Sequence, residues 1–147
     1  MTKIISLIEK AFALKATAAF QNVDLNTLLS IGDQLDVACY KAGDDIFHQG
    51  RSGHNTYIII EGTVTLSDGD TTVTLESTTL FGEEEALTDT PRRYTATAAT
   101  LCTVLLLSRT ALINSISECP TIAINLLTEY CTLTLRHFPC NKEKVTS

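Results

Sequence analysis

The sequence has little positive charge and no long apolar run, and each shortage excludes a class of function. Lys and Arg together number 11 against 17 Asp and Glu, which gives a formal net charge of -6. A nucleic-acid-binding domain usually needs a basic face to neutralise phosphates, so nucleic acid is not an expected partner. No apolar run approaches the ~18 residues that span a bilayer, and Glu9, Lys10 and Lys15 interrupt the apolar stretch near the N-terminus. We therefore expect a cytoplasmic protein without membrane insertion.

The chain also lacks the residue patterns of a disulfide framework, a metal site or a catalytic nucleophile. Its five cysteines form no Cys-x-x-Cys pair, which is typical of reduced thiols that pack as small apolar side chains. His48, His54 and His137 do not form the His-x-His cluster that a metal-dependent jelly-roll enzyme needs. No Gly-x-Ser-x-Gly motif occurs. These absences argue against an enzyme and predict neither a metal nor a cofactor.

The periodicity of apolar residues changes twice along the chain. The 147 residues, 44% of them hydrophobic, suit a single compact domain that buries roughly two-thirds of its unfolded surface. Helical spacing comes first, with Asp24 as the N-cap of a second helix. A two-residue period broken by glycines then predicts short strands of a sandwich or barrel, and helical spacing returns after Arg109. We predict one α+β domain over residues 1–140, divided into a helical lead-in (1–36), a β-barrel (37–109) and C-terminal helices (110–138), followed by a polar tail (141–147).

The segment around Gly82 carries the strongest chemical signal. Gly82 leads into a short acidic turn, and Arg92 follows nine residues after Glu83. Free N–H groups at a helix start attract phosphate, and an Arg can direct two hydrogen bonds onto phosphate oxygens. The Glu83 carboxylate could accept a hydrogen bond from a ribose hydroxyl. Alternatively, the acidic residues stabilise the helix dipole and the Arg is simply solvated, so the pattern by itself leaves both interpretations open.

With these residues in place, the chain resembles the cyclic-nucleotide-binding domain family over nearly its whole length. The match includes an opening strand motif rich in spaced glycines and a phosphate-binding cassette over residues 81–95, followed by a Cys and a Ser-Arg pair. The matching residues are Tyr40, Gly43, Asp44, Ile46, Phe47, Gly50, Gly53, Tyr57, Ile59, Gly62, Phe81, Gly82, Glu83, Pro91, Arg92, Thr95, Cys102, Ser108 and Arg109.

The resemblance implies an antiparallel jelly-roll barrel, flanked by helices, that binds cAMP or cGMP and relays occupancy through its C-terminal helices to an unknown protein effector. It implies that Arg92 binds the cyclic phosphate and that Glu83 binds the ribose 2′-hydroxyl. The helix after Pro120 corresponds to one that caps the base or forms a dimer seam. We predict a ligand-binding set that consists of Gly82, Glu83, Glu84, Arg92, Arg93 and Thr95.

Several residues depart from the family pattern beside the expected phosphate site. Glu85 stands where the family usually has Ala or Gly, so its carboxylate would repel a cyclic phosphate or pair with Arg92 in the ligand's place. If Glu85 instead turns outward, solvent screening removes most of this repulsion. Arg93 replaces a small residue and could offset Glu85. Glu76 and Thr78 replace two glycines, which indicates a different turn. The alternative to a receptor is therefore a degenerate domain of the same fold, in which Glu85 and Arg92 form an internal plug and the chain serves as a scaffold or dimerisation module.

The last helix has an apolar stripe with two interpretations. Ile122, Leu126, Tyr130 and Leu133 recur at helical spacing after Pro120. One interpretation is a homodimer seam through the C-terminal helix. The other, which we favour, is packing of one stripe on the barrel.

Overall fold

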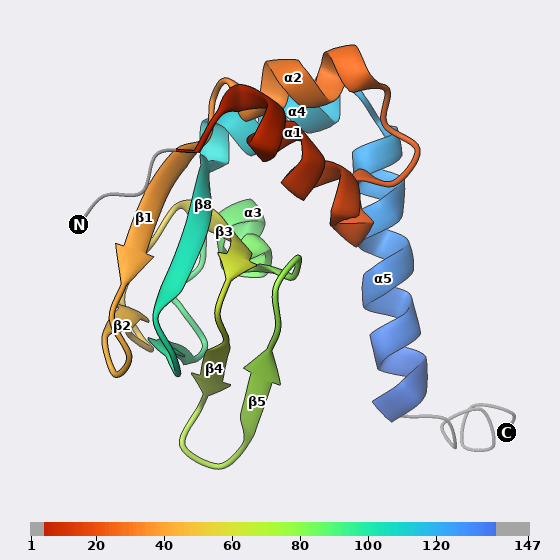
Figure 1. Cartoon of the computed structure of the whole chain (residues 1–147). Helices are drawn as coiled ribbons and strands as arrows, with labels where there is room; N and C mark the ends of the chain where they lie inside the picture. Colours follow the sequence, from red (N-terminus) through yellow and green to blue (C-terminus); the bar gives the residue numbers. More distant parts are fainter. Residues whose placement is uncertain (1–4, 138–147) are drawn as a thin grey trace, which may run out of the picture.

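The computed structural model describes residues 5–137, with side chains up to residue 131. Within this range, helices from both ends of the chain gather over one side of a β-structure, and the long helix α5 extends beyond it (Figure 1). The predicted polar tail, residues 141–147, lies outside the described residues. The helices are α1 (Leu7–Ala16), the 3-10 turn η1 (Ala18–Phe20), α2 (Leu25–Gly32), α3 (Glu83–Thr88), α4 (Arg109–Glu118) and α5 (Thr121–His137).

The described strands form two four-stranded antiparallel sheets. One sheet has the order β1-β8-β3-β6 and the other β2-β7-β4-β5. This arrangement confirms the predicted jelly-roll fold with flanking helices, but the prediction of a barrel is wrong, because the edge strands of the two sheets do not pair with each other. The strands are β1 (Asp36–Tyr40), β2 (Asp45–Phe47), β3 (Asn55–Glu61), β4 (Val64–Ser67), β5 (Thr72–Leu75), β6 (Leu80–Phe81), β7 (Thr95–Ala98) and β8 (Cys102–Ser108).

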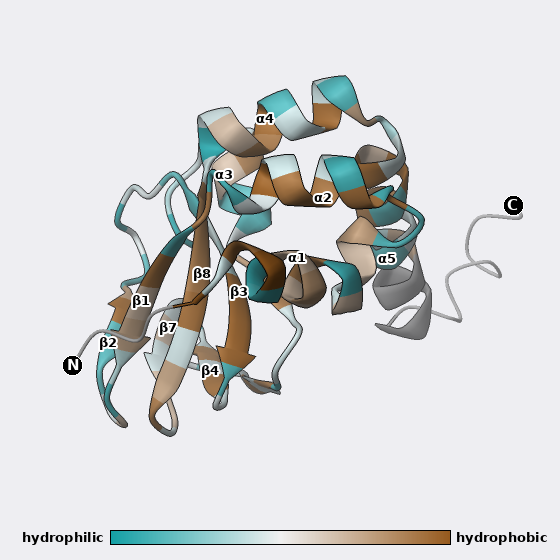
Figure 2. Ribbon diagram, turned by 45° about the horizontal axis from the view of Figure 1, so that its top comes forward, coloured by the Kyte–Doolittle hydropathy of each residue, from teal (hydrophilic) through white to brown (hydrophobic). Residues whose placement is uncertain are grey.

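Strands β3 and β8 are apolar along most of their length because they are covered on both faces. Successive side chains of a strand point to opposite faces. Ile58 of β3 therefore packs with the helices, while Tyr57 and Ile59 pack between the two sheets. Figure 2 shows these central strands as the most hydrophobic part of the sheet beneath α1, α2 and α4. The fold thus has two apolar layers, and the candidate site lies at the end of the layer between the sheets.

The lead-in helices have well-defined starts. In α1, Ser6 and Glu9 form a capping box, and in α2 the Asp24 carboxylate accepts a hydrogen bond from the Thr27 N–H, as predicted for an N-cap. The predicted helices are confirmed. However, α1 packs through small and medium side chains such as Ala11 and Leu14, whereas Phe12 is exposed.

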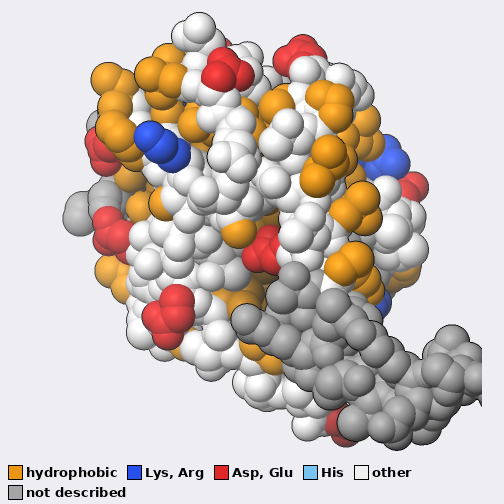
Figure 3. Space-filling model, turned by 90° about the vertical axis from the view of Figure 1, so that its right-hand side faces the viewer, with side chains coloured by type: hydrophobic (Ala, Val, Ile, Leu, Met, Phe, Trp, Pro, Cys, Tyr) orange, Lys and Arg blue, Asp and Glu red, His pale blue; other side chains and the backbone are white. Residues whose placement is uncertain are grey.

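Helix α5 is anchored near its start by one buried side chain and by hydrogen bonds of Asn125. Ile122 is fully buried, and the Asn125 amide donates to the carbonyls of Ala19 (3.0 Å) and Gln21 (2.8 Å). The predicted apolar stripe is divided, because Leu126 packs against the core while Tyr130 is exposed. Figure 3 shows hydrophobic side chains exposed on the face that carries α5. The side chain of Leu133, the last member of the stripe, lies outside the described part.

No helix among the described residues combines the length and apolarity needed to cross a membrane.

Candidate functional site

The site is built around the turn that connects β6 to α3. Gly82 caps α3 with φ +83°, a left-handed conformation that L side chains rarely adopt. A Cβ atom at this position would lie 2.8 Å from Nη1 of Arg92 and 3.2 Å from the Asn55 carbonyl oxygen. The glycine is therefore required twice, once by the backbone and once by the close approach of Arg92.

Arg92 reaches into this turn from the segment before β7, and it is almost fully buried, with 2% of its surface exposed. Its Nη1 donates to the Gly82 carbonyl at 2.8 Å and to Oε1 of Glu85 at 3.2 Å. Its Nη2 donates to the Asn55 carbonyl at 2.6 Å. Nε is buried without a partner among the described residues. Two backbone carbonyl oxygens and one carboxylate oxygen therefore accept hydrogen bonds from the guanidinium group.

Aromatic rings enclose the guanidinium group on another side. The Phe47 ring centre lies 4.2 Å from the central guanidinium carbon of Arg92, and the Tyr57 ring centre lies 5.9 Å from it. A guanidinium over an aromatic face gains from the ring quadrupole, more so when water is excluded. Phe47 also lies beside Tyr94 and Phe81, with ring centres 5.6 Å and 6.1 Å away. These rings restrict the side-chain conformations available to Arg92.

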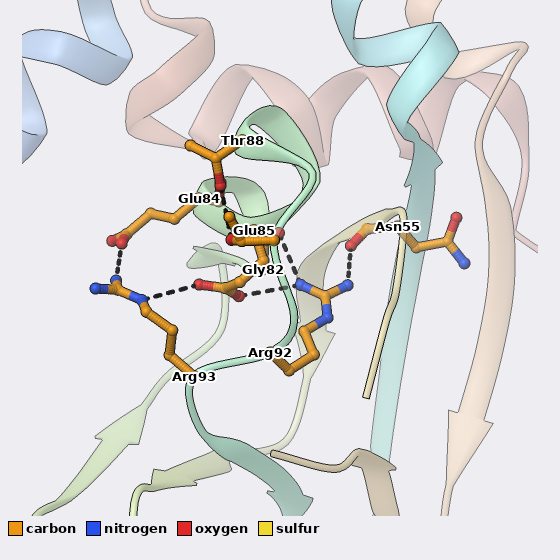
Figure 4. A network of polar contacts seen from close by, with 8 residues as sticks. Asn55, Gly82, Glu84, Glu85, Thr88, Arg92 and Arg93 are labelled. Atoms are coloured by element: carbon orange, nitrogen blue, oxygen red, sulfur yellow. Dashed lines mark hydrogen bonds and ion pairs between the residues drawn. The ribbon is translucent and has the colours of Figure 1, made fainter. Parts of the chain in front are cut away.

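The central acidic group is Glu85 in the first turn of α3, and none of its surface is exposed. Figure 4 shows its carboxylate between the guanidinium groups of Arg92 and Arg93. Oε1 lies 3.2 Å from Nη1 of Arg92, and Oε2 lies 3.4 Å from Nε of Arg93. A buried charge is costly unless it is paired and hydrogen-bonded, so these two contacts account for the burial of a carboxylate here.

Arg93 and Glu84 form the exposed side of the same network. The Arg93 guanidinium contacts the Glu84 carboxylate through Nη2, and 61% of the Arg93 side chain is exposed. Arg92 and Arg93 are neighbours in sequence, yet one is buried and the other faces solvent. Glu85 therefore has one partner that is shielded from water and one that is not.

Glu83, at the start of α3, differs from both neighbouring acids. Its Oε2 is buried without a hydrogen-bond partner among the described residues. The pKa of Glu83 is raised to about 7, mainly by burial and to a smaller extent by the nearby charges of Glu84, Glu85 and Glu129. Burial, together with the nearby carboxylates, also raises the pKa of Tyr94. The interior of the site thus disfavours additional negative charge.

The structure brings most of the predicted site residues together. Gly82, Glu84, Glu85, Arg92 and Arg93 form one contact network, and Glu83 lies beside it on the same turn of α3. The predicted member Thr95 lies outside the network, and its hydroxyl accepts a hydrogen bond from the Gln49 N–H at 3.0 Å.

Sequence reasoning did not place Asn55, Phe47 or Tyr57 beside Arg92. Asn55 contributes only a backbone carbonyl, so no choice of residue type signals its role. Phe47 belongs to the opening strand motif. Because side chains of a strand point alternately to its two faces, the only available signal was that Phe47 falls on the inward-facing side of β2.

The histidines in the described region form contacts away from this network. His48 lies 3.3 Å from the Asp45 carboxylate and His54 lies 3.5 Å from that of Asp89, and both histidine side chains are more than half exposed. The side chain of His137 is outside the described part. Among the described residues, no group of three or more His, Cys, Asp or Glu is arranged to hold a metal ion.

Comparisons with known proteins place the chain in a family. A family model described as "Cyclic nucleotide-binding domain" matches residues 37–119, which is more than half of the chain. The cAMP-dependent protein kinase regulatory subunit of Dictyostelium discoideum is 31% identical over 94 residues, covering 58% of this chain and 29% of that protein. The chain spans less than a third of the length of the curated relatives it matches.

Solved structures share the fold. The regulatory domain of Toxoplasma gondii PKA, crystallised with cAMP, superposes with a TM-score of 0.73 at 20% identity, covering 86% of this chain and 49% of that one. The regulatory subunit of a cAMP-independent protein kinase A from Trypanosoma cruzi, bound to guanosine, superposes with a TM-score of 0.70 at 21% identity, covering 79% and 42%. The first of these structures is a regulatory domain and the second a regulatory subunit.

Proposed function

The chain belongs to the cyclic nucleotide-binding domain family, and we propose that it is a regulatory domain in which Glu85 competes with the phosphate of cAMP or cGMP for Arg92. In the unliganded protein the Glu85 carboxylate holds the position of the phosphate. The ligand binds only when this carboxylate moves away from Arg92.

One observation carries the proposal: Oε1 of Glu85 lies 3.2 Å from Nη1 of Arg92, and neither side chain exposes more than 1% of its surface. A cyclic phosphate is a monoanion that would use the same donor. Two like charges about 4 Å apart at an effective dielectric constant near 20 repel by about 4 kcal/mol, which is nearly a thousandfold in affinity. Binding with Glu85 in place is therefore strongly disfavoured.

The remaining family positions support a nucleotide rather than a simple anion. Gly82, Glu83 and Arg92 stand where the family holds ribose and phosphate, and Oε2 of Glu83 is a buried acceptor without a partner among the described residues. A ribose hydroxyl that donates to this oxygen would satisfy it, and an unsatisfied buried acceptor costs about 1–3 kcal/mol. This cost would be recovered on binding.

Helix α5 is the proposed route from the site to an effector. Its Asn125 joins the helix to η1 and to the residue that follows it, through hydrogen bonds to the carbonyls of Ala19 and Gln21. Exposed side chains on α5, including Leu127 and Tyr130, offer a surface for a protein effector or a second copy of the chain. We expect this regulation to take place in the cytoplasm.

Calorimetric titration with cAMP and with cGMP tests the proposal. We expect weak binding to the wild-type protein and binding up to about a thousandfold tighter to Glu85→Ala, because the competing charge is gone. Glu85→Gln removes the charge but keeps the size of the side chain, and it guards against a folding defect in the alanine variant. Glu118→Ala removes the same charge from an exposed position on α4 and should leave the affinity unchanged.

Two results would contradict the proposal. Equal affinity of the wild-type and both Glu85 variants would show that Glu85 does not compete with phosphate. Silence of all folded variants toward both nucleotides would favour the scaffold or dimerisation module instead.

A second candidate ligand is a neutral ribonucleoside. Since Glu85 already supplies the negative charge at Arg92, a ligand without phosphate needs no displacement of the carboxylate. The Trypanosoma cruzi structure with guanosine has this fold. Titration with adenosine and guanosine tests this candidate: wild-type binding that Glu85→Ala does not improve would favour it, and silence toward both would exclude it.

A further inference from the structure

Glu85 has two cationic partners in different environments, and the difference suggests how it leaves Arg92. Its Oε1 faces Nη1 of Arg92, whose side chain is 1% exposed, and its Oε2 faces Nε of Arg93, whose side chain is 61% exposed. A phosphate oxygen that accepts a hydrogen bond from Nη1 of Arg92 would compete with Oε1 and not with Oε2. The contact with Arg93 lies on the opposite side of the carboxylate (Figure 4).

We infer that Arg93 is the positioning residue that retains the Glu85 carboxylate when a phosphate displaces it from Arg92. This inference rests on the proposed function. A displaced Glu85 without Arg93 would be a buried carboxylate with no counter-ion, which is a costly state. With Arg93 in place, the displaced carboxylate shifts toward the Arg93 guanidinium and stays paired.

Glu84 holds Arg93 in the orientation that this role requires. Its carboxylate contacts Nη2 of Arg93, which leaves Nε directed at Glu85. Glu84 and Glu85 are consecutive in α3, and Arg93 bridges the two. The pair of acids and the exposed guanidinium therefore form a unit that can shift without exposing an unpaired charge to the interior.

Three roles of Arg93 predict different results. As a positioning residue for Glu85, Arg93 matters for binding only while Glu85 is present. As a direct phosphate ligand, it matters equally with or without Glu85. As a residue that holds Glu85 against Arg92, it opposes binding, and its removal increases affinity.

A double-mutant cycle separates these roles. The affinity for cAMP is measured by NMR titration, which detects weak binding, for the wild type, Arg93→Ala, Glu85→Ala and the double variant. We expect Arg93→Ala to weaken binding by about tenfold in the wild-type background and to have much less effect in the Glu85→Ala background, a coupling that is typical of residues in contact. Arg93→Lys, which restores a cation, should recover most of the loss.

Each other outcome overturns either the inference or its premise. Equal losses in both backgrounds, or a gain of affinity in Arg93→Ala, would overturn the role of Arg93 while leaving the site intact. Binding by Glu85→Ala with none by the wild type would also overturn it, because Glu85 would then never leave Arg92. Silence of a folded Glu85→Ala variant would instead refute the proposed function itself. Thermal unfolding of each variant verifies the fold.

Discussion

Replacing Glu83 by Gln should change how the stability of the protein depends on pH. Burial raises the pKa of Glu83 from its ordinary value of 4.5 to about 7. Between these two values the folded protein retains a proton that the unfolded chain has lost. The free energy of unfolding therefore falls as the pH rises through this window.

The magnitude follows from the two pKa values. A pKa that rises from 4.5 to about 7 corresponds to about 3 kcal/mol once Glu83 is fully ionised in both states. Most of this loss, about 2–3 kcal/mol, falls between about pH 5 and about pH 8. Glutamine has the same shape and carries no titrating proton, so Glu83→Gln should lack this component.

Urea unfolding of both proteins across this pH range measures the effect. We expect the wild-type protein to lose about 2–3 kcal/mol more than Glu83→Gln as the pH rises, since only the wild type must ionise a buried carboxyl. Stability curves that run parallel for the two proteins would refute the reasoning, because they would show that Glu83 ionises as freely in the folded protein as in the unfolded chain.

Three further substitutions test other parts of the structure by denaturant unfolding. Arg92→Met should lower the free energy of unfolding by about 3–5 kcal/mol because it leaves Glu85 buried without this partner. The added change Glu85→Leu should recover much of the loss. An Arg92→Met variant as stable as the wild type would contradict a buried ion pair. Asn125→Ala should cost about 1–3 kcal/mol through two lost hydrogen bonds, and no cost would show that α5 is not anchored there. Thr78→Gly should stabilise the protein by about 1 kcal/mol because Thr78 has φ +66°, whereas destabilisation would contradict this backbone conformation.

Features that depend on local sequence could be predicted. Asp24 begins a helix because its side chain accepts a hydrogen bond within the same turn. The β-branched apolar run in β3 marks a strand from its own residues. The helical turn that begins at Gly82 could likewise be predicted, because its glycine and its acidic residues are neighbours in sequence. The resemblance to the family, carried by matching residues from Tyr40 to Arg109, indicated that Gly82 and Arg92 share a site.

Features that depend on tertiary packing could not be predicted. The sequence left open whether Glu85 faces Arg92 or turns outward, because either conformation suits a short helix, and only the packing of α3 against β3 decides it. The backbone carbonyl of Asn55 carries no residue-specific signal. The closure of the sheets was predicted wrongly because strand periodicity reports which face is buried, and not whether edge strands pair.

The central claim, that Glu85 and the ligand phosphate compete for Arg92, is tested most directly by crystal structures of the wild-type and Glu85→Ala proteins grown with cAMP. We expect the phosphate beside Nη1 of Arg92 in the Glu85→Ala crystal. In any wild-type molecule that holds cAMP, we expect Glu85 to have left Arg92. A wild-type structure with the phosphate on Arg92 and Glu85 still 3.2 Å from the same guanidinium nitrogen would contradict the account.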